Sequence, residues 1–173
     1  MDKSISNNIL RFILLWVVQI LIFKQLYWGW GGTIYLQIHI YTLFILLLPF
    51  KTVRSLVLLL AFVLGFGIDI FYESRGMHAG ALVFMAYMRG FALKFFVPRE
   101  GYNPKDSPTK HSLGAGWFLK YAGLLVFLHL FFYYSLEAFT FVYLGTILTK
   151  TFFSWLGTMF FILIIVYITN PKE

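Results

Sequence analysis

Long apolar stretches, separated by short polar, glycine-containing or proline-containing breaks, dominate the sequence. A helix needs about 20 mostly apolar residues to cross the hydrocarbon core of a bilayer. Runs such as 55–66 are apolar on every side rather than alternating, which favours helices over the strands of a membrane barrel. The pattern predicts six helical segments, at about residues 8–27, 35–49, 52–72, 78–97, 113–136 and 142–168.

These segments predict an all-α integral membrane protein, a six-helix transmembrane bundle that forms a single domain over residues 1–173. The second segment is short and ends at Pro49, while the last is longer than one crossing requires. The stretch 98–112 is rich in proline and charge, which indicates a loop between the fourth and fifth helices. Such a loop is too short to fold as a domain. Function is therefore expected from the helices, the short loops or partners.

Composition excludes an ordinary soluble domain. Hydrophobic residues make up 60% of the chain and charged residues only 12%, whereas about 25% of a soluble domain is charged. The absence of cysteine excludes disulfides, thiolate metal sites and cysteine nucleophiles. In a membrane protein, basic residues gather in the cytoplasmic loops. Their positions along the chain therefore distinguish a membrane protein from a soluble protein that binds nucleic acid.

The net charge of +7 follows this topology. If the N-terminus is cytoplasmic, most of the 14 basic residues fall on the cytoplasmic side. These are Lys3, Arg11, Lys51, Arg54, Lys94, Arg99, Lys105, Lys110, Lys120 and Lys172. Both termini are therefore predicted to be cytoplasmic, and the charge is expected to attract anionic lipid headgroups rather than nucleic acid.

Three polar side chains are predicted to lie at depth in the membrane: Gln19, Asp69 and Arg89. Asp69 falls near the outer end of the third segment and Arg89 near the midplane of the fourth. Their depths differ by roughly 10 Å at the helical rise, so a direct pair is not expected. Gln19, at a similar depth, is the expected partner of Arg89. Asp69 is expected to cap the outer turn or accept hydrogen bonds near the 73–78 loop.

No set of side chains suited to catalysis stands out. The seven acidic residues are scattered singly, which leaves no paired carboxylates and no chain of groups for proton transfer. His39 and His129 are expected to be packing residues. A metal site at His78 would need Asp69 and Glu73 to converge with it around the outer loop. We therefore predict no catalytic residues, no metal site and no cofactor, and not an enzyme.

Small residues mark faces of the third and fourth segments. Residues four apart share one face of a helix, and small side chains there let a second helix approach closely. The positions are Ala61, Gly65, Gly67 and Asp69 in the third segment and Gly76, Gly80, Ala86 and Gly90 in the fourth. Two interpretations remain open: the two helices pack on each other, or the face forms a docking groove for a partner helix.

These residues also carry a resemblance to a known family. The run Gly65-Phe-Gly-Ile-Asp69, followed by Gly76-Met-His-Ala79 and preceded by the Leu-Leu-Leu-Pro-Phe hinge at 46–50, resembles MreD, a membrane protein of the bacterial rod-shape machinery. The run 88–102 is similar to one subgroup of that family, and the resemblance covers nearly the whole chain. One departure is visible, because residues 34–41 lack an expected Asn-Pro pair.

The resemblance implies a non-enzymatic scaffold of the elongation complex in the bacterial inner (cytoplasmic) membrane. It would dock MreC, and through MreC it would be linked to the MreB filament, the glycosyltransferase RodA and its class B penicillin-binding transpeptidase. This role serves peptidoglycan synthesis and the regulation of cell shape. Whether MreC would dock on the third and fourth helices or on the first is left open.

The MreD family is also similar in fold to the S-component of ECF vitamin transporters, which provides the alternative function of a substrate-binding subunit. S-components dock on their transport module through an Ala-x-x-x-Ala face in the first helix, but 8–27 contains no alanine. A vitamin-binding protein also needs polar outer loops around its ligand, and the loops predicted here are short.

Overall fold

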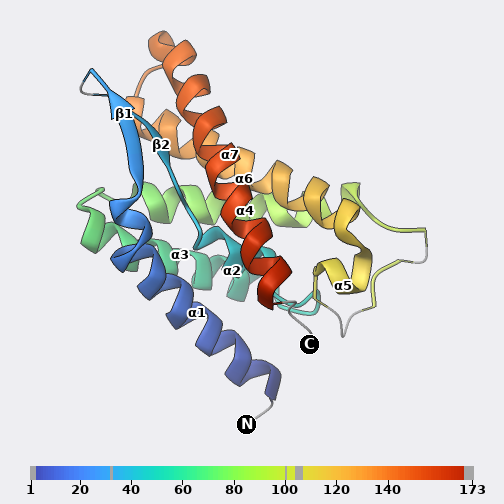
Figure 1. Cartoon of the computed structure of the whole chain (residues 1–173). Helices are drawn as coiled ribbons and strands as arrows, with labels where there is room; N and C mark the ends of the chain where they lie inside the picture. The colour runs from blue at the N-terminus through green and yellow to red at the C-terminus, as the bar shows by residue number, and fades with distance from the viewer. Residues whose placement is uncertain (1–2, 32, 100, 104–106, 170–173) are drawn as a thin grey trace.

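The computed structural model describes residues 3–31, 33–99, 101–103 and 107–169 (Figure 1). Its elements are α1 (Lys3–Leu21), η1 (Phe23–Gln25), β1 (Tyr27–Trp30), β2 (Thr33–Gln37), α2 (Thr42–Leu46), α3 (Arg54–Tyr72), α4 (Met77–Phe95), α5 (Lys110–Leu113), α6 (Ala115–Ala138), η2 (Phe141–Tyr143) and α7 (Leu144–Thr169). Helices dominate, as the sequence predicts. The described strands form one antiparallel hairpin.

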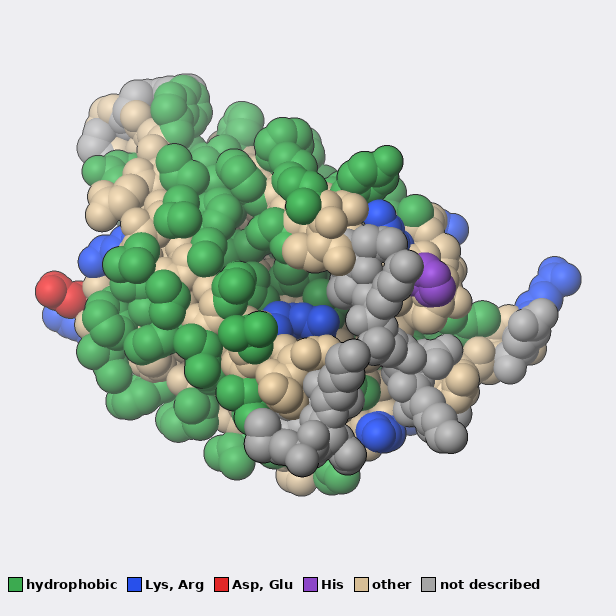
Figure 2. Space-filling model, turned by 60° about the horizontal axis from the view of Figure 1, so that its bottom comes forward, with side chains coloured by type: hydrophobic (Ala, Val, Ile, Leu, Met, Phe, Trp, Pro, Cys, Tyr) green, Lys and Arg blue, Asp and Glu red, His purple; other side chains and the backbone are tan. Residues whose placement is uncertain are grey.

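Four described stretches are helical, long and apolar enough to span a membrane: Ser6–Gln25, Arg54–Tyr72, Ala115–Ala138 and Leu144–Thr169. Hydrophobic side chains cover much of the surface in Figure 2. Such a surface is unfavourable in water and suits a lipid environment. α4 is as long as α3 but less apolar, and it is not among these four stretches. Length and composition thus support a membrane protein.

The predicted helix at 35–49 is wrong. This part of the chain forms β2, an extended stretch and the five-residue helix α2. An apolar run of this length fits a buried strand as well as a helix, and the β-branched residues among 33–40 favour the strand. The first helix also ends at Leu21 rather than at residue 27, because Tyr27–Trp30 pairs with β2. The predicted six-helix count is therefore not confirmed.

Residues 38–49 lie in the centre of the protein and, apart from the five residues of α2, form no helix; we call them the non-helical segment. Every residue in it is buried, and Ile40, Tyr41, Ile45 and Leu46 have no exposed surface. Other elements surround it. β2, which leads into the segment, runs along α7, and α2, which lies within it, contacts α1 and α4. The hydrophobic core is thus built around an irregular stretch of backbone.

The long helices surround this centre in a set of neighbouring pairs. α3 packs along α4, α4 packs on α6, and α6 packs on α7. α1 contacts α3 and lies at one edge of the protein, as the blue helix of Figure 1. The hairpin, the α3–α4 turn and the start of α7 lie toward the left of that view, whereas the termini and α5 lie toward the bottom and right. The protein therefore has two distinct ends, which the predicted topology assigns to the two membrane surfaces.

The loop predicted at 98–112 contains the short helix α5. Thr109 and Ser112 form a capping box at its start. Residues 100 and 104–106 of this loop lie outside the described part of the chain. Tyr102 stacks on Phe50 with ring centroids 4.5 Å apart and donates a hydrogen bond to the Leu93 carbonyl at 2.7 Å. Burial raises the pKa of Tyr102 to about 12, so its hydroxyl remains a donor at neutral pH.

Candidate functional site

Gln19 of α1 binds the backbone of the non-helical segment. Its side-chain Nε2 donates to the Ile38 carbonyl at 2.9 Å, and its Oε1 accepts from the Ile40 N–H at 2.8 Å. Gln19 is completely buried. Irregular backbone at membrane depth is tolerated only where protein groups replace the hydrogen bonds that water would otherwise make. One amide side chain supplies both partners here, as a neighbouring strand would.

α7 supplies further partners from two hydroxyl residues one helical turn apart. Ser154 Oγ accepts from the Gln37 N–H at 3.0 Å, and Thr158 Oγ1 accepts from the His39 N–H at 3.1 Å. Residues four apart share one helix face, so both hydroxyls meet the same strand. This pair was not among the predicted residues. Its i, i+4 spacing is a weak signal in the sequence, because α7 also carries Lys150 and further threonines.

Arg89 of α4 binds the other end of the segment. Its guanidinium donates to the carbonyls of Leu48 and Pro49 and, through Nε, to the Tyr121 hydroxyl at 3.2 Å. Tyr121 in turn donates to the Leu46 carbonyl at 3.3 Å. The expectation that Gln19 would be the partner of Arg89 is wrong. A planar guanidinium has several donors in a fixed fork, so it can bind two neighbouring carbonyls and the Tyr121 hydroxyl at once.

Asp69 joins the end of α3 to the beginning of α4. Its Oδ1 accepts from the Ser74 hydroxyl and from the His78 N–H at 3.0 Å, and its Oδ2 accepts from the Ala79 N–H at 2.9 Å. His78 Nδ1 lies 3.0 Å from Oδ1. The expected hydrogen bonding near the 73–78 loop is confirmed.

The role of Asp69 is that of a helix cap supplied from another helix. The N-cap residue of α4 is Gly76, which has no side chain to cap the first N–H groups. Those groups otherwise lack partners, and a carboxylate satisfies two of them and complements the positive end of the helix dipole. Because an ionised carboxylate only accepts, the Nδ1–H tautomer of His78 fits this arrangement.

A second polar cluster lies in the core between the non-helical segment and α6. The Tyr41 hydroxyl is 2.9 Å from His129 Nε2 and 3.2 Å from His39 Nδ1, and these two ring nitrogens are 3.2 Å apart. All three residues are buried. The expectation that His39 and His129 are packing residues agrees with their aromatic contacts, including His39 on Tyr133 at 4.8 Å between centroids.

Metal binding has no geometric support among the residues that the structure describes. No group of three or more His, Asp and Glu side chains is arranged there to hold a metal ion. Asp69 and His78 do meet, but their facing atoms are occupied by each other, by Ser74 and by backbone N–H groups. These contacts join the end of α3 to the start of α4.

The small residues predicted as one face divide among several contacts. Gly65 faces α4, because a Cβ there would lie 2.5 Å from the Ala79 Cα, and Ala61, one turn earlier on α3, is completely buried. Gly67 faces Trp16 of α1 instead, at 2.8 Å from the indole Nε1 to an added Cβ. Gly80 faces Leu136 of α6. The packing interpretation therefore holds for Gly65, and the burial of Ala61 agrees with it.

The remaining predicted positions do not belong to this contact. Gly76 occupies the left-handed turn before α4 with φ +87°, where a side chain would be strained. Ala86 is buried in the protein, whereas an added Cβ at Gly90 would meet no atom within 4 Å. Gly90 thus faces away from the other helices, and the structure does not bring it together with Gly65.

Substituting Gly65 tests the α3–α4 contact. We expect Gly65→Leu to lower the stability of the isolated protein by about 3 kcal/mol, because its side chain would overlap the backbone of α4. Thermal unfolding in detergent measures this change. Gly90→Leu is the matched control on α4, with an expected change within about 0.5 kcal/mol because the position is open. Equal melting of both variants would contradict the close contact.

A shallow groove remains on the outer face of α3 and α4. It has a volume of about 740 Å³ and is open to the surroundings. Small residues form part of its lining and two phenylalanines flank it; the lining includes Phe62, Phe66, Gly76, Ala79, Gly80 and Val83. Asp69, Glu73 and Arg75 lie at its outer end. Gly76 and Gly80 are the predicted glycines that line this groove.

No protein family, curated protein or solved structure matches this chain. Functional interpretation therefore depends on the geometry above and on the motif residues of the sequence.

Proposed function

We propose that this chain is a non-enzymatic membrane scaffold of the MreD type, which docks MreC in the bacterial inner membrane. Through MreC it would connect the MreB filament with RodA and its class B penicillin-binding transpeptidase. The Gly65-to-Asp69 run and the residues 76–79 that follow it support the family. In this structure the same residues form the close α3–α4 contact and the cap of α4.

The observation that carries the proposal is what the buried polar residues bind. Gln19, Asp69 and Arg89 each bind backbone groups of the chain itself. Intramembrane polar residues of a transporter face a substrate or ion pathway and exchange partners with it. Residues already occupied by backbone suit a rigid platform instead. The lipid-facing helix surfaces are then the place for interaction.

The docking surface in this proposal is the groove on α3 and α4, and its occupant is the single transmembrane helix of MreC. Helices in a bilayer associate through close packing at small residues, since lipid and protein are equally apolar. Ala79 and Gly80 give the groove a low floor, and Phe62 and Phe66 give it walls. A helix seated there could contact backbone closely.

Filling the groove tests the docking surface. We expect Val83→Trp to reduce the amount of MreC that co-purifies from detergent-solubilised membranes by at least about fivefold, since overpacking costs about 1–3 kcal/mol. Val63→Trp is the matched control, because Val63 is half-exposed on α3 and does not line the groove. Both variants should melt like the unmodified protein.

Two outcomes would contradict the proposal. Equal retention of MreC by both variants would exclude this groove as the docking surface. Capture of an ATPase transport module in place of MreC and the synthase pair would favour the S-component alternative, in which the chain binds a vitamin.

A further inference from the structure

A wedge-shaped gap separates α1 from α3 at the end of the protein where α1 begins. The two helices meet at their opposite ends: Trp16 packs edge-on against Phe71, with centroids 5.5 Å apart, and Gln19 donates to the Tyr72 hydroxyl at 2.7 Å. Lys24 Nζ donates to the Phe71 carbonyl at 2.7 Å. Gly67 allows the close approach, because its missing side chain leaves room for the Trp16 indole.

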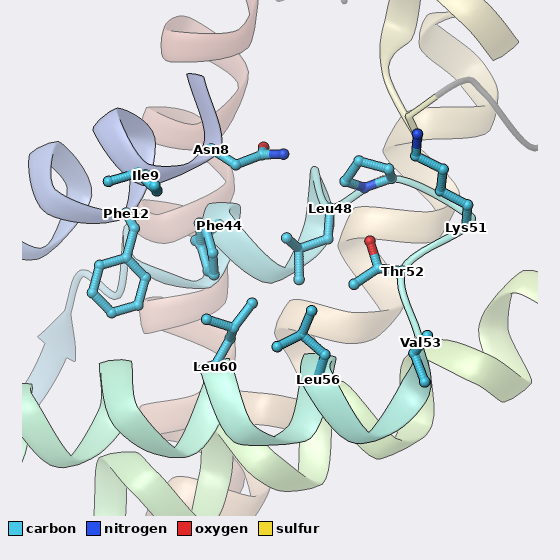
Figure 3. A pocket seen from close by; sticks show the side chains of 11 residues that line it. Asn8, Ile9, Phe12, Phe44, Leu48, Lys51, Thr52, Val53, Leu56 and Leu60 are labelled. Atoms are coloured by element: carbon cyan, nitrogen blue, oxygen red, sulfur yellow. The ribbon is translucent and has the colours of Figure 1, made fainter. Parts of the chain in front are cut away.

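Toward the N-terminal side of the protein, a groove lies between the two helices. Phe12 of α1 packs edge-on against Phe44 of α2 at 5.1 Å between centroids, rather than against α3. The space that remains is a groove of about 580 Å³ between α1, the 44–53 stretch and α3. Figure 3 shows Phe12, Phe44, Leu56 and Leu60 converging on it.

The groove is polar at one end and apolar along the rest. Asn8, Lys51 and Thr52 line the end where α1 and α3 begin, and Figure 3 shows the Asn8 amide and the Lys51 ammonium on the same side of the apolar lining. Lys51 is exposed, and no ion pair or hydrogen bond from its ammonium is found within the described part of the chain. The predicted topology places this end on the side that holds most of the basic residues.

We propose that this groove binds one anionic phospholipid of the leaflet on the N-terminal side. Its phosphate is held by Lys51 with Asn8 and Thr52, and one acyl chain lies between Phe12, Phe44 and Leu60. The polar end supplies donors and a positive charge for a phosphate, and the apolar length supplies a lining for hydrocarbon. This site is independent of MreC docking, which we place on the other side of α3.

Size and lining together favour an acyl chain as the occupant. A methylene group occupies about the volume of a water molecule, roughly 30 Å³, so a groove of about 580 Å³ holds about 20 such groups. The apolar length ends at Asn8, Lys51 and Thr52, which matches a lipid with a phosphate at one end of its hydrocarbon. The groove on α3 and α4 differs in its lining, because Gly76, Ala79 and Gly80 offer the small side chains that a partner helix requires.

Lipid-dependent melting of the purified protein in detergent tests the site. Dioleoyl phosphatidylglycerol should raise the melting temperature by about 5 °C, and dioleoyl phosphatidylcholine by less than half as much. Leu56→Trp should abolish both shifts by filling the groove. Lys51→Gln should abolish the preference for the anionic lipid and keep the smaller shift.

Matched controls separate this groove from general effects of charge or bulk. Leu59→Trp places the same side chain on the same helix outside the groove lining, and Lys120→Gln removes an exposed lysine of α6. Both should retain the shifts of the unmodified protein. Persistence of the lipid shift in Leu56→Trp, or equal loss of the preference in both lysine variants, would overturn the site.

A photo-crosslinking amino acid in place of Leu56 gives a second measurement that does not depend on stability. Irradiation of membranes followed by mass spectrometry should yield an adduct with the mass of an anionic phospholipid. An adduct with another protein at this position would overturn the proposal and would show that a partner occupies the groove. The same reagent at Leu59 should yield at most unselective lipid adducts.

Discussion

Replacing Arg89 by methionine is expected to lower the melting temperature of the protein by roughly 10 °C. Methionine keeps an unbranched apolar chain but removes every donor, which leaves the carbonyls of Leu48 and Pro49 without the guanidinium. Removing one partner of a buried charged interaction costs about 3–5 kcal/mol. For a chain of this size each kcal/mol corresponds to about 2–4 °C. Thermal unfolding in detergent is the measurement.

Conservative and control variants sharpen this test. The melting temperature of Arg89→Lys should lie between those of the unmodified protein and Arg89→Met. A lysine ammonium keeps the charge but lacks the fork that reaches Tyr121 and two carbonyls. Arg54→Met is the matched control, since Arg54 is exposed and lies over the Tyr87 ring at 4.4 Å. Its cost should be within about 1 kcal/mol. A wild-type melting curve for Arg89→Met would show that the non-helical segment holds without this residue.

The second large effect is expected from Asp69→Ala. This change removes the acceptor for the Ser74 hydroxyl and for the N–H groups of His78 and Ala79. Two N–H groups at the start of α4 would then be buried without partners, at about 1–3 kcal/mol each. We therefore expect a loss of about 3–5 kcal/mol in the free energy of unfolding, and little retention of MreC.

Asp69→Asn separates the hydrogen bonds from the charge. Its remaining oxygen can still accept from Ser74 and His78, but its amide nitrogen would face the Ala79 N–H, which is donor against donor. We expect Asn to retain much of the function and to cost about 1–2 kcal/mol, less than Ala. Equal defects in both variants, with a proton or substrate flux in vesicles that Asp69→Asn abolishes, would contradict the scaffold and favour a transporter.

The buried polar residues share one structural role. Gln19, Ser154 and Thr158 hold one end of the non-helical segment and Arg89 holds the other. In lipid, backbone groups without partners cost several kcal/mol each, so an irregular stretch persists only when side chains replace the missing hydrogen bonds. These residues explain how a largely helical protein can hold the non-helical segment in its core.

The sequence by itself determined the helical stretches of α1, α3, α4, α6 and α7 and several local features. Hydropathy over about 20 residues depends only on composition, so those segments could be read without tertiary information. The close contact at Gly65 and the hydrogen bonding of Asp69 were also predictable. Their residues follow helical spacing, and the 73–76 turn that joins the helices is short enough to keep the two ends together.

Only the tertiary structure decided the second segment and the partners of Gln19 and Arg89. The apolar pattern at 35–49 fits a helix and a buried strand equally well, and the choice depends on hydrogen bonds from distant helices. Those bonds span 19 residues from Gln19 to Ile38, 119 from Thr158 to His39 and 41 from Arg89 to Leu48. The depth of a residue along a helix does not show in which direction its side chain points around the helix axis. Arg89 and Gln19 therefore lie at similar predicted depths and yet bind opposite ends of the same segment.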